Sequence, residues 1–174
     1  MMKKHFIKSL ALTPAMLGTL LAASGAHGAT SSTATSTFTV TATVAPSCTV
    51  TATSLAFGNY TLAQLDGTST ITLTCTNGTG YNIGLDAGTS PSATTSARKM
   101  TGPTVSSTVQ YLSYALYQDS GRSTNWGNVV GTSTLAGTGT GSAVGVTVYG
   151  RITANQQAAL GSYSDTITVT VTYQ

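Results

Sequence analysis

The chain closes on Thr166-Ile-Thr-Val-Thr-Val-Thr-Tyr173, in which every second residue is apolar. Successive side chains of an extended strand point to opposite faces, so the alternation separates the apolar residues from the threonines. Branching at Cβ favours the extended backbone, and the threonine hydroxyls suit a solvated face. The stretch therefore predicts a half-buried β-strand whose inner face carries Ile167, Val169, Val171 and Tyr173.

The same alternation recurs through most of the chain. It is clear in residues 38–44, 70–75, 112–116 and 144–150, and weaker in residues 49–57 and 81–86. Threonine occupies 34 of the 146 positions after residue 28, mostly where an outer face is expected. About seven short strands joined by Gly- and Asn-rich turns predict an all-β, immunoglobulin-like β-sandwich.

Two segments do not follow this pattern. Residues 154–160 have a helical composition and span at most two turns. Residues 90–107 contain Pro91 and Pro103 among many serines and threonines, and we expect a long loop with irregular extended segments.

The first 28 residues have the layout of a secretory signal peptide. Three lysines within the first eight residues precede an apolar stretch from Leu10 to Ala23, and small residues follow it. The apolar stretch is about 14 residues long, whereas a membrane span needs about 20. We expect residues 1–28 to be removed on export, before Ala29, which leaves a mature chain of one-domain size.

Charge separates the predicted leader from the rest of the chain. The net charge of +3 arises from seven Lys and Arg against four Asp, but residues 29–174 carry four charges of each sign. There is no Glu, and both histidines lie before residue 30. The mature chain therefore has no histidine that could act as the base for a nucleophile. It also has no pair of acids and no basic patch. These observations predict no enzyme, no cofactor and no nucleic-acid partner.

The two cysteines, Cys48 and Cys75, both lie in the mature chain. In an exported protein an isolated pair is interpreted first as a disulfide. A structural zinc site would require two further ligands, and no histidine is available to supply them. In the entropy model the bond would constrain the unfolded chain by about 3–4 kcal/mol.

The segment before Cys48 has an unusual order. Residues 29–36 are only Ala, Thr and Ser, which predicts a flexible leader. An alternating strand over residues 37–44 follows and is stopped by Pro46. Such a strand can pair with its own sheet or with the open edge of another molecule, because both use the same backbone hydrogen bonds. Its apolar face carries Phe38, Val40, Ala42 and Val44.

Several motifs resemble the spore coat protein U-type domain. The first half of the resemblance rests on Cys48-Thr-Val, Leu55-Ala-Phe57-Gly-Asn-Tyr60 and Ile71-Thr-Leu-Thr-Cys75. Its most specific part is the ending, Val148-Tyr-Gly-Arg-Ile152 followed by Gly161-Ser-Tyr-Ser-Asp165 and the closing strand. The resemblance covers nearly the whole mature chain. This domain is found in subunits of archaic (alternative) chaperone–usher pili of Gram-negative bacteria.

The resemblance implies a pilin that polymerises by donor-strand complementation. In such a subunit the sandwich lacks its last strand, so a hydrophobic groove lies open. A periplasmic chaperone fills the groove until, at the outer-membrane usher, the N-terminal strand of the next subunit replaces it. Carried onto this chain, residues 29–47 hold the leader and the donor strand, and residues 48–174 form the incomplete domain. The residues Ile167, Val169, Val171 and Tyr173 would border the acceptor groove.

The same resemblance implies where the protein acts and with what. The expected partners are other copies of the chain or sister pilins, a periplasmic chaperone and an outer-membrane usher. The expected location is the cell surface, reached through the periplasm, where a fimbria supports adhesion and biofilm formation. Since 146 residues leave no room for an added receptor-binding domain, we expect a shaft or minor structural subunit.

Two alternatives remain open at this stage. In a secreted, self-complemented coat protein, residues 37–44 would fill the groove of their own chain. In a carbohydrate- or surface-binding module, aromatic residues would form a binding face. We expect Tyr114 and Trp126 to pack in the core instead, with Tyr111 and Tyr117 covering its edge. The candidate face consists of Tyr111, Tyr114, Tyr117, Trp126 and Tyr149.

Overall fold

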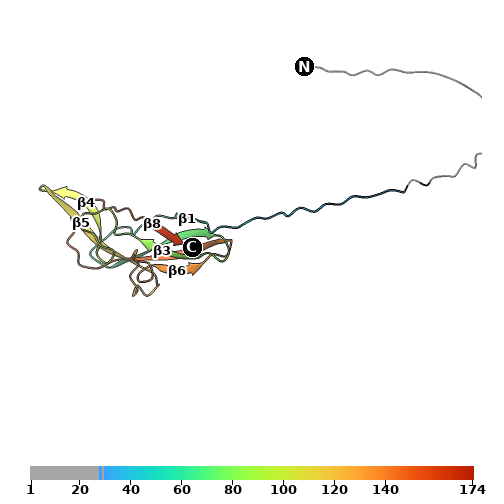
Figure 1. Ribbon diagram of the computed structural model, residues 1–174. Helices are drawn as coiled ribbons and strands as arrows, with labels where there is room; N and C mark the ends of the chain where they lie inside the picture. Colours follow the sequence, from blue (N-terminus) through green and yellow to red (C-terminus); the bar gives the residue numbers. More distant parts are fainter. Residues whose placement is uncertain (1–27, 29) are drawn as a thin grey trace, which may run out of the picture. The chain divides into compact units, whose positions relative to one another are not determined.

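A computed structural model describes Gly28 and residues 30–174, so the predicted signal peptide over residues 1–28 lies outside the described residues except for Gly28. By its internal contacts the chain divides into a unit that ends at Thr41 and a unit from Ala42 to Gln174. The second unit contains every strand found among the described residues (Figure 1). The strands are β1 (Cys48–Ala52), β2 (Leu65–Cys75), β3 (Gly80–Leu85), β4 (Arg98–Val105), β5 (Thr108–Tyr117), β6 (Leu135–Thr138), β7 (Ala143–Ile152) and β8 (Val169–Tyr173).

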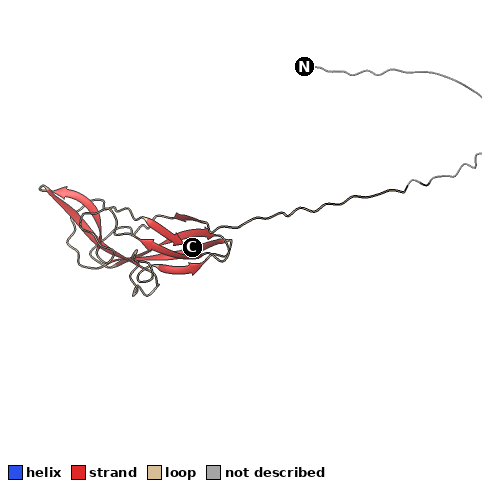
Figure 2. Ribbon diagram, in the orientation of Figure 1, coloured by secondary structure: helices blue, strands red, loops and turns tan. Residues whose placement is uncertain are grey.

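The strands form two antiparallel sheets. One sheet has the order β1-β2-β7-β5-β4 and the other the order β6-β3-β8. A single core lies between them, and it takes buried residues from both sheets together with Trp126. No helix occurs in the described residues, as Figure 2 shows. The prediction of an all-β sandwich is confirmed.

Strand β2 illustrates how the alternation builds the core. It pairs with β7 over ten positions, from Leu65 opposite Ile152 to Thr74 opposite Ala143. Its odd-numbered side chains, such as Ile71 and Leu73, are buried, whereas the threonines between them face outward. Burial of each large aliphatic side chain contributes about 1.5–3 kcal/mol.

The disulfide joins the first two strands at one end. Cys48 and Cys75 are bonded with an S–S distance of 2.06 Å, and they are also directly opposite each other in the β1–β2 ladder. The ladder continues one residue further, because the Thr76 backbone N–H donates to the Ser47 carbonyl at 2.9 Å. The chain is thus held to the domain from Ser47 onward.

Several predicted elements differ from the structure. Residues 154–160 form no helix, because Asn155 takes a φ of 64°, in the left-handed region that interrupts a helix. The segment 49–57 is a strand only as far as Ala52. Residues 37–44 are in no strand of this single chain, in which they have no ladder partner.

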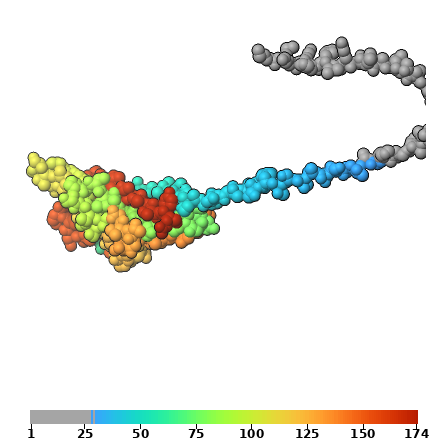
Figure 3. All heavy atoms as spheres, viewed as in Figure 1, coloured from blue at the N-terminus to red at the C-terminus, as the bar shows by residue number. Residues whose placement is uncertain are grey.

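The predicted loop over residues 90–107 contains an edge strand, β4, and this prediction was wrong. Pro103 is tolerated there because it lies at an irregularity in the ladder between Thr101 and Thr104. With β5 it forms a hairpin that projects from the body of the domain (Figure 3). The hairpin turns at Ser106 and Ser107, both with positive φ, as a tight two-residue turn requires. The short strand β6 was also not predicted.

Candidate functional site: an open groove between two sheet edges

A groove lies between the outermost strands of the two sheets. Strand β1 is an edge of the five-stranded sheet and pairs only with β2, while β8 is an edge of the three-stranded sheet and pairs only with β3. The two strands lie near each other, as Figure 1 also shows. The groove has a volume of about 480 Å³, and its floor is apolar: Ile71, Leu85, Leu116 and Val148.

The first wall of the groove is the segment that follows β1. After Thr53, whose backbone N–H still donates to the Thr70 carbonyl, the chain leaves the ladder. Leu55 and Phe57 then lie on the inner face of the sheet, over two glycines. A Cβ atom at Gly150 would lie 2.8 Å from Leu55 Cδ1 and from Phe57 Cζ, so any larger residue there would displace these side chains. The Phe57 ring also meets the Tyr114 ring edge to face, with the centroids 6.3 Å apart.

The second wall is the segment that leads into β8. From Tyr163 to Val171 the odd-numbered residues are half-buried and the even-numbered ones exposed, so the segment is extended throughout. The strand nevertheless begins at Val169, three residues later than the alternation from Thr166 predicted. The reason is that the facing chain turns at Gly88. Backbone pairing ends at Asp86, whose N–H donates to the Thr168 carbonyl at 3.2 Å, while its side chain accepts the Thr168 backbone N–H at 3.0 Å.

Asp165 holds this second wall to the domain. Its carboxylate accepts hydrogen bonds from the Thr89 backbone N–H at 2.8 Å and from the Tyr114 hydroxyl at 2.7 Å. Burial, together with the bond to Asp165, raises the pKa of the Tyr114 phenol, so this hydroxyl stays protonated and donates. These contacts give Asp165 a structural role, just before the closing strand.

Arg98 anchors the loops beneath the groove. Its side chain is only 1% exposed and donates hydrogen bonds to four carbonyl oxygens from three separate segments. These acceptors are Leu85 (2.9 Å), Asp86 (2.8 Å), Thr95 (2.7 Å) and Trp126 (2.7 Å). The sequence pattern predicted only a loop over residues 90–107 and gave Arg98 no role of this kind. The signal available in the sequence was Met100, an apolar residue two positions later and therefore on the same face of an extended chain.

The residues predicted for the groove border occupy different depths. Ile167 and Val169 line the groove, and Val171 is half-buried against the core. Tyr173 is more open, with 43% of its surface exposed.

The residues of the predicted donor stripe are all exposed. Phe38, Val40 and Val44 are 87%, 81% and 79% exposed, and Ala42 is exposed too. In this single chain the stripe is therefore an uncovered apolar surface.

Among residues 28 and 30–174 no three His, Cys, Asp or Glu side chains gather in a way that could hold a metal ion. The part of the chain that the structure describes also has no helix long and apolar enough to cross a membrane.

The carboxylates predict how stability depends on pH. A hydrogen bond from Arg151 lowers the pKa of Asp66, and backbone amides of Thr124 and Ser123 lower that of Asp119 to about 2. Desolvation raises the pKa of Asp86, but hydrogen bonds from Thr168 and Gly88 bring it below the ordinary value. Because these folded-state pKa values are depressed, the stabilisation is present above about pH 4 and is lost as the pH falls toward 2.

Urea unfolding at several pH values tests this prediction. We expect the midpoint to stay nearly constant from pH 8 to pH 5, since the mature chain has no His or Glu to titrate there, and to fall between pH 4 and pH 2. The D119N variant should show a shallower fall. A marked loss of stability between pH 7 and pH 5 would contradict the assignment.

Comparison with known proteins gives a family and a set of structural neighbours. The sequence model of the Spore Coat Protein U domain matches residues 34–170. "Protein U" of Myxococcus xanthus is 36% identical over 111 residues, which cover 63% of this chain and 62% of that protein. The chain thus spans less than two thirds of this relative.

Two solved structures align with this chain, one of them well enough to indicate a similar fold. A chain of the CsuC–CsuE chaperone–tip adhesion subunit pre-assembly complex, from archaic chaperone–usher Csu pili of Acinetobacter baumannii, aligns with a TM-score of 0.54 at 22% identity. The alignment covers 74% of this chain and 40% of that one. The E. coli Hda pilus minor tip subunit HdaB aligns with a TM-score of 0.40 at 16% identity, over 71% of this chain and 79% of that one. Neither the family description nor the name of the Myxococcus relative is that of an enzyme, which agrees with the prediction of no enzyme.

Proposed function

The chain belongs to the Spore Coat Protein U domain family, and from that premise we propose that it is a structural subunit of a chaperone–usher pilus. Its groove receives the N-terminal strand of another copy or of a sister pilin. The observation that carries this proposal is an apolar groove between two sheet edges, β1 and β8, that each have a partner on one side only. An added strand supplies hydrogen bonds to an open edge and side chains to the floor.

The donor in this proposal is residues 37–44. At period two its four apolar side chains follow one another about 6.8 Å apart along one face. Burial of three large side chains and one alanine contributes at most about 5–10 kcal/mol, before the cost of ordering the segment. That is enough to hold a joint without a covalent bond. The stripe consists of Phe38, Val40, Ala42 and Val44, and the acceptor border of Ile167, Val169, Val171 and Tyr173.

Assembly requires a partner for the groove before polymerisation. We propose a periplasmic chaperone in this role, because an open apolar groove is an aggregation hazard until it is covered. The Acinetobacter neighbour is part of a chaperone–tip adhesion subunit complex, which supports the same assignment. An outer-membrane usher would then exchange the chaperone for the next subunit, and the fibre would stand on the cell surface, where it supports adhesion and biofilm formation.

The alternative is a coat protein that fills its own groove with residues 37–44. The match to Protein U is compatible with this alternative, because the name of that relative is not that of a pilus subunit. Only three residues, 45–47, separate the stripe from β1. Pro46 restricts the backbone of this connection, and Ser47 is already tied to Thr76. A reversal of direction within it would therefore be tight, which favours an intermolecular joint.

Electrophoresis of surface-extracted material in SDS, with and without boiling, tests the proposal. We expect a ladder of heat-sensitive oligomers in the unboiled sample, because strand-complemented joints resist detergent until they are heated. Boiling should collapse the ladder to a single monomer band. A lone monomer band in both samples would support the self-complemented coat protein instead.

A further inference from the structure

The outer face of the five-stranded sheet divides into two chemically different halves. Toward the disulfide end, every second residue of β1 and β2 is a threonine on this face, and Thr49 on β1 lies opposite Thr74 on β2. Toward the other end, β5 and β7 present Tyr117 directly opposite Tyr149, and Tyr111 lies further along β5. We call this second half the tyrosine face, defined by Tyr111, Tyr117, Tyr149, Lys99, Arg122 and Arg151.

Each outer tyrosine of this face has a cation nearby. The Lys99 ammonium lies 4.4 Å from the centre of the Tyr111 ring, and the Arg122 guanidinium lies 5.7 Å from that of Tyr149. Tyr117 stands beside Arg151, because Ala115 pairs with Arg151 and Tyr117 with Tyr149. Such contacts hold the rings and the charges in fixed positions at the surface.

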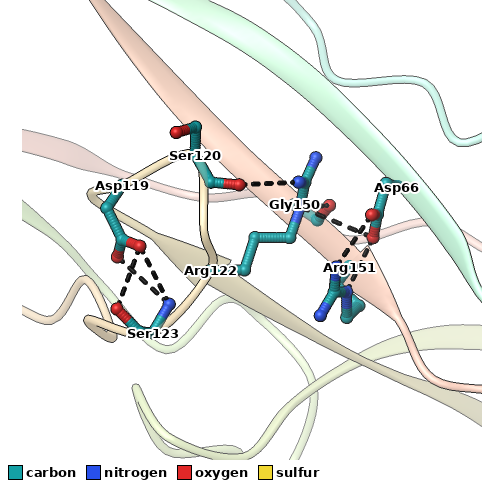
Figure 4. Close-up of polar contacts among 7 residues, drawn as sticks. All are labelled: Asp66, Asp119, Ser120, Arg122, Ser123, Gly150 and Arg151. Atoms are coloured by element: carbon teal, nitrogen blue, oxygen red, sulfur yellow. Dashed lines mark hydrogen bonds and ion pairs between the residues drawn. The ribbon is translucent and has the colours of Figure 1, made fainter.

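The tyrosine face concentrates the positive charge of the mature chain. Of the four cations after residue 28, Arg98 is buried and the other three lie here. Asp66 is the acid among them: it accepts two hydrogen bonds from Arg151 at 2.7 and 2.8 Å and lies 3.4 Å from Arg122 (Figure 4). Asp119 is at the margin, where its carboxylate is engaged by Ser123. The face is therefore positive although residues 29–174 balance.

A cleft opens within this face, where β5 separates from β7. The two strands pair only over Ala115–Tyr117, and beyond that point the Gln156 side chain bonds the Ser113 backbone N–H and carbonyl, both at 2.8 Å. The cleft measures about 400 Å³, within the usual size of a small-ligand site. Lys99 and Arg151 line it together with the hydroxyls of Ser92, Ser96, Ser113 and Thr153.

We propose that the tyrosine face binds an acidic polysaccharide, with a carboxylate-bearing sugar unit in the cleft. Lys99 and the outer edge of the Arg151 guanidinium attract the carboxylate, and the hydroxyls of the lining bond those of the sugar. Tyr117 and Tyr149 supply flat, amphipathic surfaces on which the flanking sugar rings lie. A protein partner would instead need an apolar centre, and such a centre is absent from this charged face.

Binding of the mature chain to polygalacturonate, measured by surface plasmon resonance, tests this site. We expect binding at low salt that weakens as salt is raised, and no binding to the neutral polymer dextran. The K99Q variant should bind about tenfold more weakly, because it loses a charge-assisted contact, whereas K99R should retain most of the affinity.

Two controls separate the site from general charge attraction. T72Q, on the threonine half of the same sheet, should bind like the unmodified chain, and all variants should unfold at the same temperature. Polyglutamate, an anionic polymer without sugar rings, should bind much more weakly than polygalacturonate. Equal affinity of K99Q and the unmodified chain, or equal binding of the two anionic polymers, would overturn the proposal.

Discussion

Removal of residues 29–44 is expected to stop fibre growth completely while leaving a subunit that still binds its chaperone. The groove is built from residues between Ala52 and Val169, so the shortened chain keeps the acceptor and loses only the donor. The disulfide and the Ser47–Thr76 hydrogen bond lie beyond the cut and should hold β1 in place. Co-purification with the chaperone and the yield of surface polymer are the two measurements.

A matched deletion separates the donor stripe from the segment before it. Removal of residues 30–36, which contain only Ala, Thr and Ser, keeps the whole stripe and should leave polymerisation intact. In a mixture with the intact chain, the subunit that lacks residues 29–44 should shorten the fibres, because it accepts a strand but offers none. Long fibres formed by that subunit alone would rule out this donor.

The alternation of apolar and polar residues was sufficient to predict most strands. Where it is strict, as in the segments that became β2, β5 and β7, one face is buried and the other solvated, so the period of two is visible in the sequence. It was less informative for β4, an edge strand with Gly102 and Pro103 in its middle. Edge positions tolerate such residues because one side of their backbone needs no partner.

The groove itself was not visible in the sequence. Its walls are two segments more than a hundred residues apart, and neither is a regular strand over its whole length. Leu55 and Phe57 reach the inner face only because Gly67 and Gly150 leave room for them, and such a contact depends on the register between β2 and β7. The resemblance to a family implied an open groove, but the physical pattern of the chain implied only a sandwich.

The burial of Arg98 is a second feature that could not be predicted from the sequence. Charge counting places an arginine at the surface, because an unpaired buried cation is costly. Here hydrogen bonds to four carbonyl oxygens offset that cost. The oxygens belong to three chain segments that lie together only in the folded domain. Burial lowers the pKa of the guanidinium without bringing it near neutrality, so the group stays charged and holds the three segments together.

The V40D substitution is expected to weaken the subunit joint by several orders of magnitude. Val40 is the second of the four apolar positions, so in the proposed joint its side chain lies over the apolar floor of the neighbouring groove. A carboxylate there loses the burial of a valine and leaves a charge without a partner, at a cost of roughly 4–6 kcal/mol. At about 1.4 kcal/mol for each factor of ten, the joint dissociates about a thousandfold more readily or more.

The T41D substitution provides the matched control, because residue 41 alternates with the stripe and points to the opposite face of the strand. It adds the same charge one residue away and should leave the heat-sensitive ladder nearly unchanged, whereas V40D should abolish it. Neither change lies in the folded domain, so both isolated subunits should unfold at the temperature of the unmodified chain. Equal loss of polymer in the two variants would mean that charge anywhere in the segment is disruptive. It would also remove the support for a one-sided, buried stripe.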